Sequence, residues 1–478
     1  MTSSDPIPIP LPSMDTDLTL NTEYLPEYDT DLSLASPSYS AHPGLTEISL
    51  HPEPFSPEIS SSTHHWSCET KHMRIDLGPH IWGLTSPSYG LGGTVVGSVK
   101  FLEQRQHVEQ VTVSFEGRLT TFRPYRGTNS DSASPIVSRT FPLYTSCMGC
   151  VFDWEAEHPF TIPIPTEINT PGGGTAPTPP SFNCYFYGSA VEVTYTIKID
   201  MVHKGNLNNL RRHETYDFLP APSKLTNFVH RKAIPVYYLP KTQPADPPLS
   251  TIPRPSRLSE ETDIYLHWLD RVHTAPATPS WTNTKCKSDL DRFMKAVYVS
   301  IPTPQRFSAG DEIPFAVSLL FTKEPYFAKL LTRCIRVVLL KRISFGPKKK
   351  IFNSNSEEND NSNHSEWVLT SGQLKYQNEF AEGVRLLRGY VKAGGTGKES
   401  SWLVDSVGVQ YVIRVTVVPP KNLADHIPIF HHEEIVELTT DHWGPSPQPV
   451  INGMPTPAIG LASDPQSNWI GNTVYAVV

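Results

Sequence analysis

Two short segments of this chain carry residue types that could perform chemistry: a cysteine pair and a glycine-rich stretch. Cys147 and Cys150 form one CxxC pair, but a structural zinc ion needs four ligands, and no second CxxC or spaced histidine pair follows nearby. Residues 394–398 (GGTGK) are similar to a phosphate-binding loop, yet Glu399 stands where Ser or Thr must hold magnesium. We therefore interpret the cysteines as part of a β-region and residues 394–398 as a loop between strands.

The densest group of possible metal ligands lies further along the chain and comprises His426, His431, His432, Glu433 and Glu434. These residues precede the last expected strand and lack the helical HExxH spacing of zinc proteases. We interpret them as an exposed turn. Because no Gly-x-Ser-x-Gly elbow occurs either, we predict a protein that is not an enzyme and that uses no metal or cofactor.

A short linear motif near the N-terminus suggests binding rather than catalysis. Leu25, Pro26 and Tyr28 form the sequence LPEY, a variant of the PY motif whose proline and tyrosine fit the aromatic groove of a WW domain. Proline-rich ligands suit such grooves because their backbone is already extended, so little entropy is lost on binding. The first proline of a full PPxY motif is replaced by Leu25.

Composition limits the classes of protein that need to be considered. The chain has 478 residues, 47 prolines and a net charge of −8, which leaves room for two domains and extensive linker. Residues 1–71 hold eleven acids and one base, so they carry −10 and the remainder carries +2. This charge balance argues against nucleic-acid binding. Without a signal peptide or a run of about 18 apolar residues, we expect a cytoplasmic protein that is recruited to membranes.

The alternation of apolar and polar residues predicts two β-rich domains between disordered ends. We divide the chain into a disordered acidic head (1–71), a first β-domain (72–238), a proline-rich connector (239–292), a second β-domain (293–443) with a polar insert (346–366), and a proline-rich tail (444–478). Within the connector, residues 259–272 have the spacing of a short amphipathic helix, which either packs on a β-domain or docks elsewhere. The apolar end of the tail, residues 474–478, is suited to strand addition at a sheet edge.

Two landmarks recur at nearly the same separation in the two β-domains. A Gly-led turn before an apolar strand occurs at Gly93 and Gly310, a separation of 310 − 93 = 217 residues. A long alternating strand with a central tyrosine begins at Val191 and again at Val407, a separation of 407 − 191 = 216 residues. Agreement within one residue predicts two copies of one β-sandwich unit in tandem.

The layout and its local sequences resemble the arrestin family, most closely the fungal α-arrestins. In the first domain the resemblance rests on Gly93, residues 97–99 (GSV), 111–117 (VTVSFEG), 160–165 (FTIPIP), 180–182 (PSF) and 191–201. In the second domain it rests on residues 310–315 (GDEIPF) and 407–418. Together these segments cover roughly residues 72–443.

The resemblance implies two immunoglobulin-like β-sandwiches that act as a non-enzymatic adaptor. In α-arrestins the sandwiches recognise integral membrane cargo such as transporters, and PY motifs recruit a HECT-type ubiquitin ligase through its WW domains, which leads to endocytosis. By this similarity Leu25, Pro26 and Tyr28 are the expected ligase-binding residues. Two alternatives stay open: a signalling or structural scaffold without a ligase, and a secreted β-sandwich module or enzyme with a glycan at Asn363.

Overall fold

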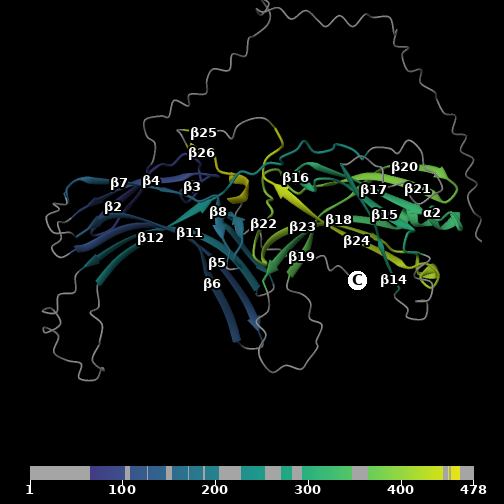
Figure 1. Ribbon diagram of the computed structural model, residues 1–478, viewed down its shortest axis with the longest axis horizontal. Helices are drawn as coiled ribbons and strands as arrows, with labels where there is room; N and C mark the ends of the chain where they lie inside the picture. Colours follow the sequence, from purple (N-terminus) through teal and green to yellow (C-terminus); the bar gives the residue numbers. More distant parts are fainter. Residues whose placement is uncertain are drawn as a thin grey trace, which may run out of the picture. The chain divides into compact units, whose positions relative to one another are not determined.

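The computed structural model shows a chain that is almost entirely β-structure, with strands arranged in several sheets and a short α-helix, α2 (Pro325–Leu331) (Figure 1). It describes residues 65–102, 108–125, 128–146, 153–170, 172–186, 189–203, 228–252, 271–281, 293–346, 364–444, 450–451 and 454–462. The predicted all-β class is therefore confirmed. Within these residues no helix is long and apolar enough to cross a membrane.

The strands between residues 65 and 238, which we call the first half, form two main sheets. A four-stranded sheet has the order β1-β2-β4-β7, and a six-stranded sheet has the order β3-β12-β11-β5-β6, with β10 added to β11 (Figure 1). The strands are β1 (His65–Glu69), β2 (Met73–Pro79), β3 (Ser88–Tyr89), β4 (Thr94–Phe101), β5 (Val108–Tyr125), β6 (Thr128–Thr145), β7 (Glu157–Pro163), β10 (Phe182–Phe186), β11 (Ser189–His203) and β12 (Phe228–Tyr238). A separate hairpin pairs β8 (Glu167–Asn169) with β9 (Thr175–Pro177).

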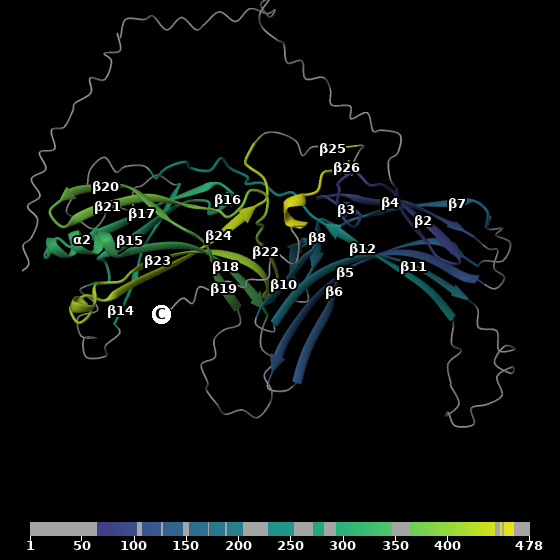
Figure 2. The ribbon, with the colours of Figure 1, turned by 180° about the vertical axis from the view of Figure 1, so that it is seen from behind.

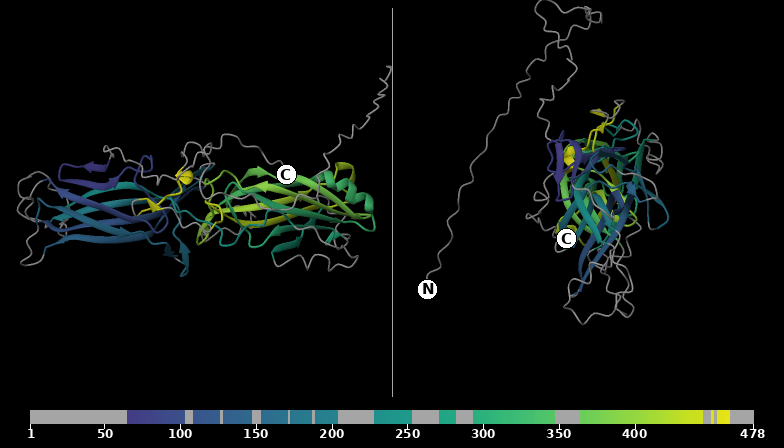
Figure 3. Two further views of the ribbon diagram at one scale, coloured as in Figure 1. Left: turned by 90° about the horizontal axis from the view of Figure 1, so that it is seen from above. Right: turned by 90° about the vertical axis from the view of Figure 1, so that its left-hand side faces the viewer.

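The strands between residues 272 and 439, the second half, form two further sheets (green to yellow in Figure 3, against purple to teal for the first half). One has the order β13-β15-β17-β21-β20, and the other has the order β14-β24-β23-β18-β19, with β16 added to β24 and β22 to β23. The strands are β13 (Val272–Pro276), β14 (Thr278–Ser280), β15 (Val297–Pro302), β16 (Arg306–Ser308), β17 (Glu312–Leu320), β18 (Ile335–Phe345), β19 (His364–Ser371), β20 (Gln373–Ala381), β21 (Val384–Lys392), β22 (Trp402–Val404), β23 (Val407–Val417) and β24 (Ile429–Thr439).

The two halves repeat one strand order. The run β1-β2-β4-β7 corresponds to β13-β15-β17-β21, and the run β12-β11-β5-β6 corresponds to β24-β23-β18-β19. Even the short additions match, because β3 pairs in parallel with β12 as β16 does with β24, and β10 forms a hairpin with β11 as β22 does with β23. The two long strands noted in the sequence, β11 and β23, occupy the same position in this order.

Alternation along these strands explains how the sheets acquire a core. Every second residue of β11 from Val191 to Met201 is buried, while the residues between them are partly exposed. Side chains are directed to opposite faces of a sheet at successive positions, so this pattern places one face of β11 on a core. That core also takes side chains such as Ile75 and Val99 from the four-stranded sheet, so both sheets of the first half contribute to it.

The connector predicted for residues 239–292 contains two strands that the sequence did not suggest. β13 pairs with β15, and β14 pairs with β24, so one strand joins each sheet of the second half. The predicted helix at 259–272 falls largely outside the described residues, and its last residue, Val272, begins β13 instead. Strands of three to five residues carry too little alternation to be recognised, and pairing with a neighbour defines them.

Part of the C-terminal segment packs on the first half, which differs from the disordered tail predicted for residues 444–478. β25 (Val450–Ile451) pairs with β26 (Met454–Pro455), which lies beside β3 and is followed by a 3-10 turn, η6 (Ile459–Ala462) (Figure 2). The backbone N–H of Ala458 donates to the carbonyl of Leu239 over 2.9 Å. A Cβ at Gly90 would lie 2.7 Å from the carbonyl oxygen of Thr456, so only glycine allows this approach.

Candidate functional site

The residues predicted from motifs fall in different places. Leu25, Pro26 and Tyr28 lie outside the described residues, as do Cys147 and Cys150. Residues 394–398 form a loop between β21 and β22, as predicted. The linear motif therefore stays a prediction.

The interpretation of the histidine- and glutamate-rich group as an exposed turn is wrong for four of its five residues and is confirmed for His426, which is exposed in a turn. His431, His432, Glu433 and Glu434 lie within strand β24, and only His426 precedes it. Successive side chains of a strand are directed to opposite faces, so His431 and Glu433 lie on one face and His432 and Glu434 on the other. No cluster of three or more metal-ligating side chains occurs among the described residues.

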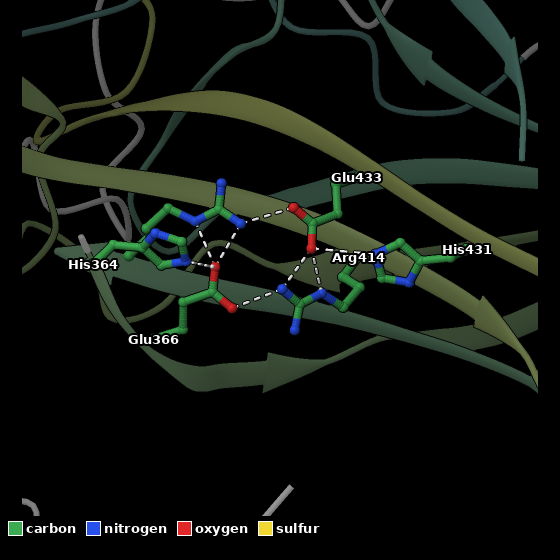
Figure 4. A network of polar contacts seen from close by, with 6 residues as sticks. His364, Glu366, Arg414, His431 and Glu433 are labelled. Carbon is green, nitrogen blue, oxygen red and sulfur yellow. Dashed lines mark hydrogen bonds and ion pairs between the residues drawn. The ribbon is translucent and has the colours of Figure 1, made fainter. Parts of the chain in front are cut away.

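Glu433 belongs to a closed set of ion pairs on the face of the sheet that is turned away from the core. Arg342 of β18 pairs with Glu366 of β19 and also with Glu433, over 2.7 Å to the latter. Arg414 of β23 donates to the same two carboxylates, over 2.6 Å to each (Figure 4). Each arginine thus contacts both glutamates, and we call Arg342, Glu366, Arg414 and Glu433 the charged quartet.

The charged quartet covers a row of aliphatic side chains that crosses four strands. Cross-strand pairing aligns Val368 with Leu340, Leu340 with Val412, and Val412 with Ile435. The arginines lie on opposite sides of this row, so the ion pairs that join them to the distant glutamates pass over its middle. Leu340 and Val412 are accordingly only 3% and 0% exposed, whereas Val368 and Ile435 at the two ends are 40% and 52% exposed.

The surroundings of Glu433 favour its ionised form. Burial raises the pKa of Glu433, but hydrogen bonds from Arg342 and Arg414 outweigh burial and lower it to about 2. Two histidines extend the set, since His364 Nε2 lies 3.2 Å from Glu366 and His431 Nε2 lies 3.3 Å from Glu433 (Figure 4). Every charge has an opposite partner within hydrogen-bond distance, so this arrangement holds four strands together rather than leaving a reactive group.

A second ionic group lies on the opposite face of the same sheet, turned toward the core. Lys341 of β18 donates to Glu399 over 2.8 Å, and their side chains are only 15% and 10% exposed. The fully buried hydroxyl of Tyr411 donates to the same Glu399 oxygen over 2.5 Å. Burial raises the pKa of Tyr411 well above its usual value, and the neighbouring Glu399 carboxylate adds to that effect. Tyr411 therefore acts as a neutral donor.

This second group borders a cavity of about 610 Å³ that is lined by both halves of the molecule. From the second half come Lys341, Glu399, Trp402 and Tyr411; from the first half come residues of β10, β11 and β12. The rings of Phe182 and Trp402, which begin the equivalent strands β10 and β22, meet edge to face with centroids 5.4 Å apart. This cavity combines apolar lining residues with a nearly buried charge pair, which are the properties expected of a ligand site.

Sequence reasoning missed Lys341 and Glu399, although one of them carried a signal. Lys341 follows Val337 and Leu339 and precedes Ile343 in the buried phase of β18, and a lysine in a core position needs a partner. Glu399 was noted only because it does not fit a phosphate-binding loop. Its distance of 58 residues from Lys341 hid the pairing.

Comparison with known proteins adds no assignment. The sequence matches no model of a protein family, and it has no significant similarity to any of the curated proteins.

Proposed function

We propose that the two halves are tandem β-sandwiches of the arrestin type and that the protein is a non-enzymatic adaptor. The observation that supports this proposal is the repeated strand order, which includes the parallel additions β3 and β16 and the hairpin strands β10 and β22. Such agreement in minor strands is more specific than a general likeness between two β-domains, and it fits the sequence resemblance that spans residues 72–443.

An adaptor of this type needs two kinds of contact. The sandwiches would recognise cytoplasmic parts of integral membrane cargo such as transporters, and the motif of Leu25, Pro26 and Tyr28 would bind the WW domains of a HECT ubiquitin ligase. Ubiquitin placed on the cargo then directs its endocytosis. The protein would work in the cytoplasm and be recruited to the plasma membrane or to endosomes.

A binding experiment with isolated WW domains tests the ligase contact. The wild-type chain is expected to bind, and Pro26→Ala/Tyr28→Ala is expected to weaken binding at least tenfold, as measured by fluorescence polarisation or calorimetry. The chain offers a matched control in Pro37→Ala/Tyr39→Ala, which removes another Pro-x-Tyr triplet of the same head and is expected to leave binding unchanged. If the wild type does not bind, the ligase-dependent adaptor is wrong and a scaffold without a ligase becomes the better description.

A further inference from the structure

The cavity between the halves has the size and the enclosed polar groups of a small-molecule site. Its volume of about 610 Å³ lies within the range of roughly 300–1,000 Å³ that is typical of ligand pockets. β11 contributes residues 192–196 to its lining, among them Glu192 and Thr194, and the second half contributes Lys341 and Tyr411.

Two groups in the wall have unused hydrogen-bonding capacity. The side-chain oxygen of Asn183 is buried and accepts no hydrogen bond. An ammonium group has three N–H donors, and Lys341 uses one of them on Glu399. A buried acceptor without a donor costs free energy, so a ligand that donates to Asn183 and accepts from Lys341 would relieve both deficits.

The charges in the wall cancel. Lys341 is neutralised by Glu399 at 2.8 Å, and the two remaining charged residues of the lining, Glu192 and Lys398, have opposite signs. Adding an anion or a cation would therefore place an uncompensated charge beside nearly buried groups, which is unfavourable. The cavity is suited to an uncharged ligand.

The remaining wall provides flat apolar surface. Phe182 and Trp402 present their rings at the point where the halves meet, and Pro180 and Leu461 lie nearby in the same lining. Aromatic side chains bind flat rings through stacked or edge-to-face contacts. A ligand with a ring and an adjacent polar group satisfies both parts of the wall.

We propose that this cavity binds an uncharged small molecule in which a flat aromatic ring carries an amide. An amide supplies a carbonyl acceptor for Lys341 and, on a separate atom, an N–H donor for Asn183. The ring occupies the space beside Phe182 and Trp402.

Three probes of one shape and different charge test the proposal on the full chain. Benzamide is neutral, benzoate is an anion and benzamidine is a cation. Ligand-observed NMR is expected to show benzamide binding at least tenfold more tightly than either charged analogue. Binding that is equally tight or tighter for benzoate or benzamidine contradicts the uncharged class, and no binding of any probe shows a cavity that holds only water; both results overturn the proposal.

Variants place the binding in the cavity. Thr194→Trp fills the space from the outer face of β11 and is expected to abolish benzamide binding, and Asn183→Leu is expected to weaken it at least fivefold. Thr112→Trp is the matched control, because Thr112 lies on the same face of the neighbouring strand β5, opposite Asp200, and does not line the cavity. Circular dichroism establishes that each variant is folded. Benzamide binding that survives Thr194→Trp, or that Thr112→Trp removes equally, overturns the assignment.

Discussion

Tyr195 and Tyr411 are 216 residues apart and occupy the same place in β11 and β23, yet their surroundings differ. In the first half, the Tyr195 hydroxyl donates to the carbonyl of Pro179 over 2.6 Å, and Gly117 lies opposite it on β5. In the second half, the Tyr411 hydroxyl donates to the carboxylate of Glu399, and the residue opposite it on β18 is Lys341. One buried phenol is therefore satisfied by the backbone and the other by an ion pair.

The difference shows two ways in which one scaffold satisfies a buried tyrosine that lines the cavity between the halves. Gly117 leaves room for the Tyr195 ring, which stacks on Phe115 with centroids 5.5 Å apart and planes inclined by 11°. Lys341 instead introduces a charge that Glu399 compensates, and taking both groups out of water is costly. Lys341 and Glu399 line the cavity, so the ion pair belongs to the ligand site proposed above.

Breaking the ion pair between Lys341 and Glu399 should have the largest effect on stability. Lys341→Met leaves the Glu399 carboxylate nearly buried without its cation, so the free energy of unfolding is expected to fall by about 3–5 kcal/mol in chemical denaturation. Lys341→Met/Glu399→Gln removes both charges and should recover most of that loss. The control is Lys198→Met in the first half. The partner of Lys198, Glu116, still has Arg118 at 3.6 Å in this variant, so the expected loss of unfolding free energy is below about 1 kcal/mol. Equal losses at Lys341 and Lys198 would contradict the distinction between the halves.

Adding a side chain opposite Tyr195 tests how tightly this layer of the first half is packed. A Cβ at Gly117 would lie 2.6 Å from the Tyr195 ring, so Gly117→Ala overpacks a fully buried site and should cost about 2 kcal/mol in the same denaturation experiment. Gly444→Ala serves as the control, because no atom lies within 4 Å of the added carbon. A Gly117→Ala variant as stable as Gly444→Ala would show that the first half tolerates a side chain at this layer.

Removing each hydroxyl separately compares the two tyrosines directly. Tyr195→Phe leaves the Pro179 carbonyl without its donor and should cost about 1 kcal/mol, whereas Tyr411→Phe removes a hydrogen bond to a charged group and should cost about 2 kcal/mol. Thermal and chemical denaturation of the two variants measure the order. A larger loss for Tyr195→Phe would mean that the ionic environment of Tyr411 contributes less than the backbone carbonyl does.

The smallest expected effect concerns acid stability of the charged quartet. The pKa of Glu433 is about 2 in the folded chain against an ordinary value of 4.5, so its stabilisation is complete above pH 4.5 and disappears as the pH falls toward 2. After allowance for solvent screening this amounts to about 1 kcal/mol. Glu433→Gln should flatten the decline of the unfolding free energy between pH 4.5 and pH 2. The control is Glu437→Gln, which removes a more exposed carboxylate of the same strand and should leave the decline unchanged. An unchanged slope in Glu433→Gln would argue against the quartet as the cause.

The long strands could be predicted from the sequence because their alternation is local, and β11 and β23 were recognised by that pattern. The ionic groups could not be predicted, because their partners come from strands that are distant in the sequence, as with Arg342 and Glu433 at a separation of 91 residues. The polar residues of β24 suggested a turn for the same reason, since the arginines that neutralise them belong to other strands. Lys341 was the exception whose position in the buried phase of β18 already implied a partner.

The charged quartet also bears on how the protein behaves at high concentration. Once Glu433 is protonated, as the pH falls toward 2, its ion pairs over Leu340 and Val412 are lost, and the aliphatic row from Val368 to Ile435 becomes more exposed to water. Apolar strips on sheet faces drive association between molecules. Strong acid should therefore favour association between molecules through this face of the sheet.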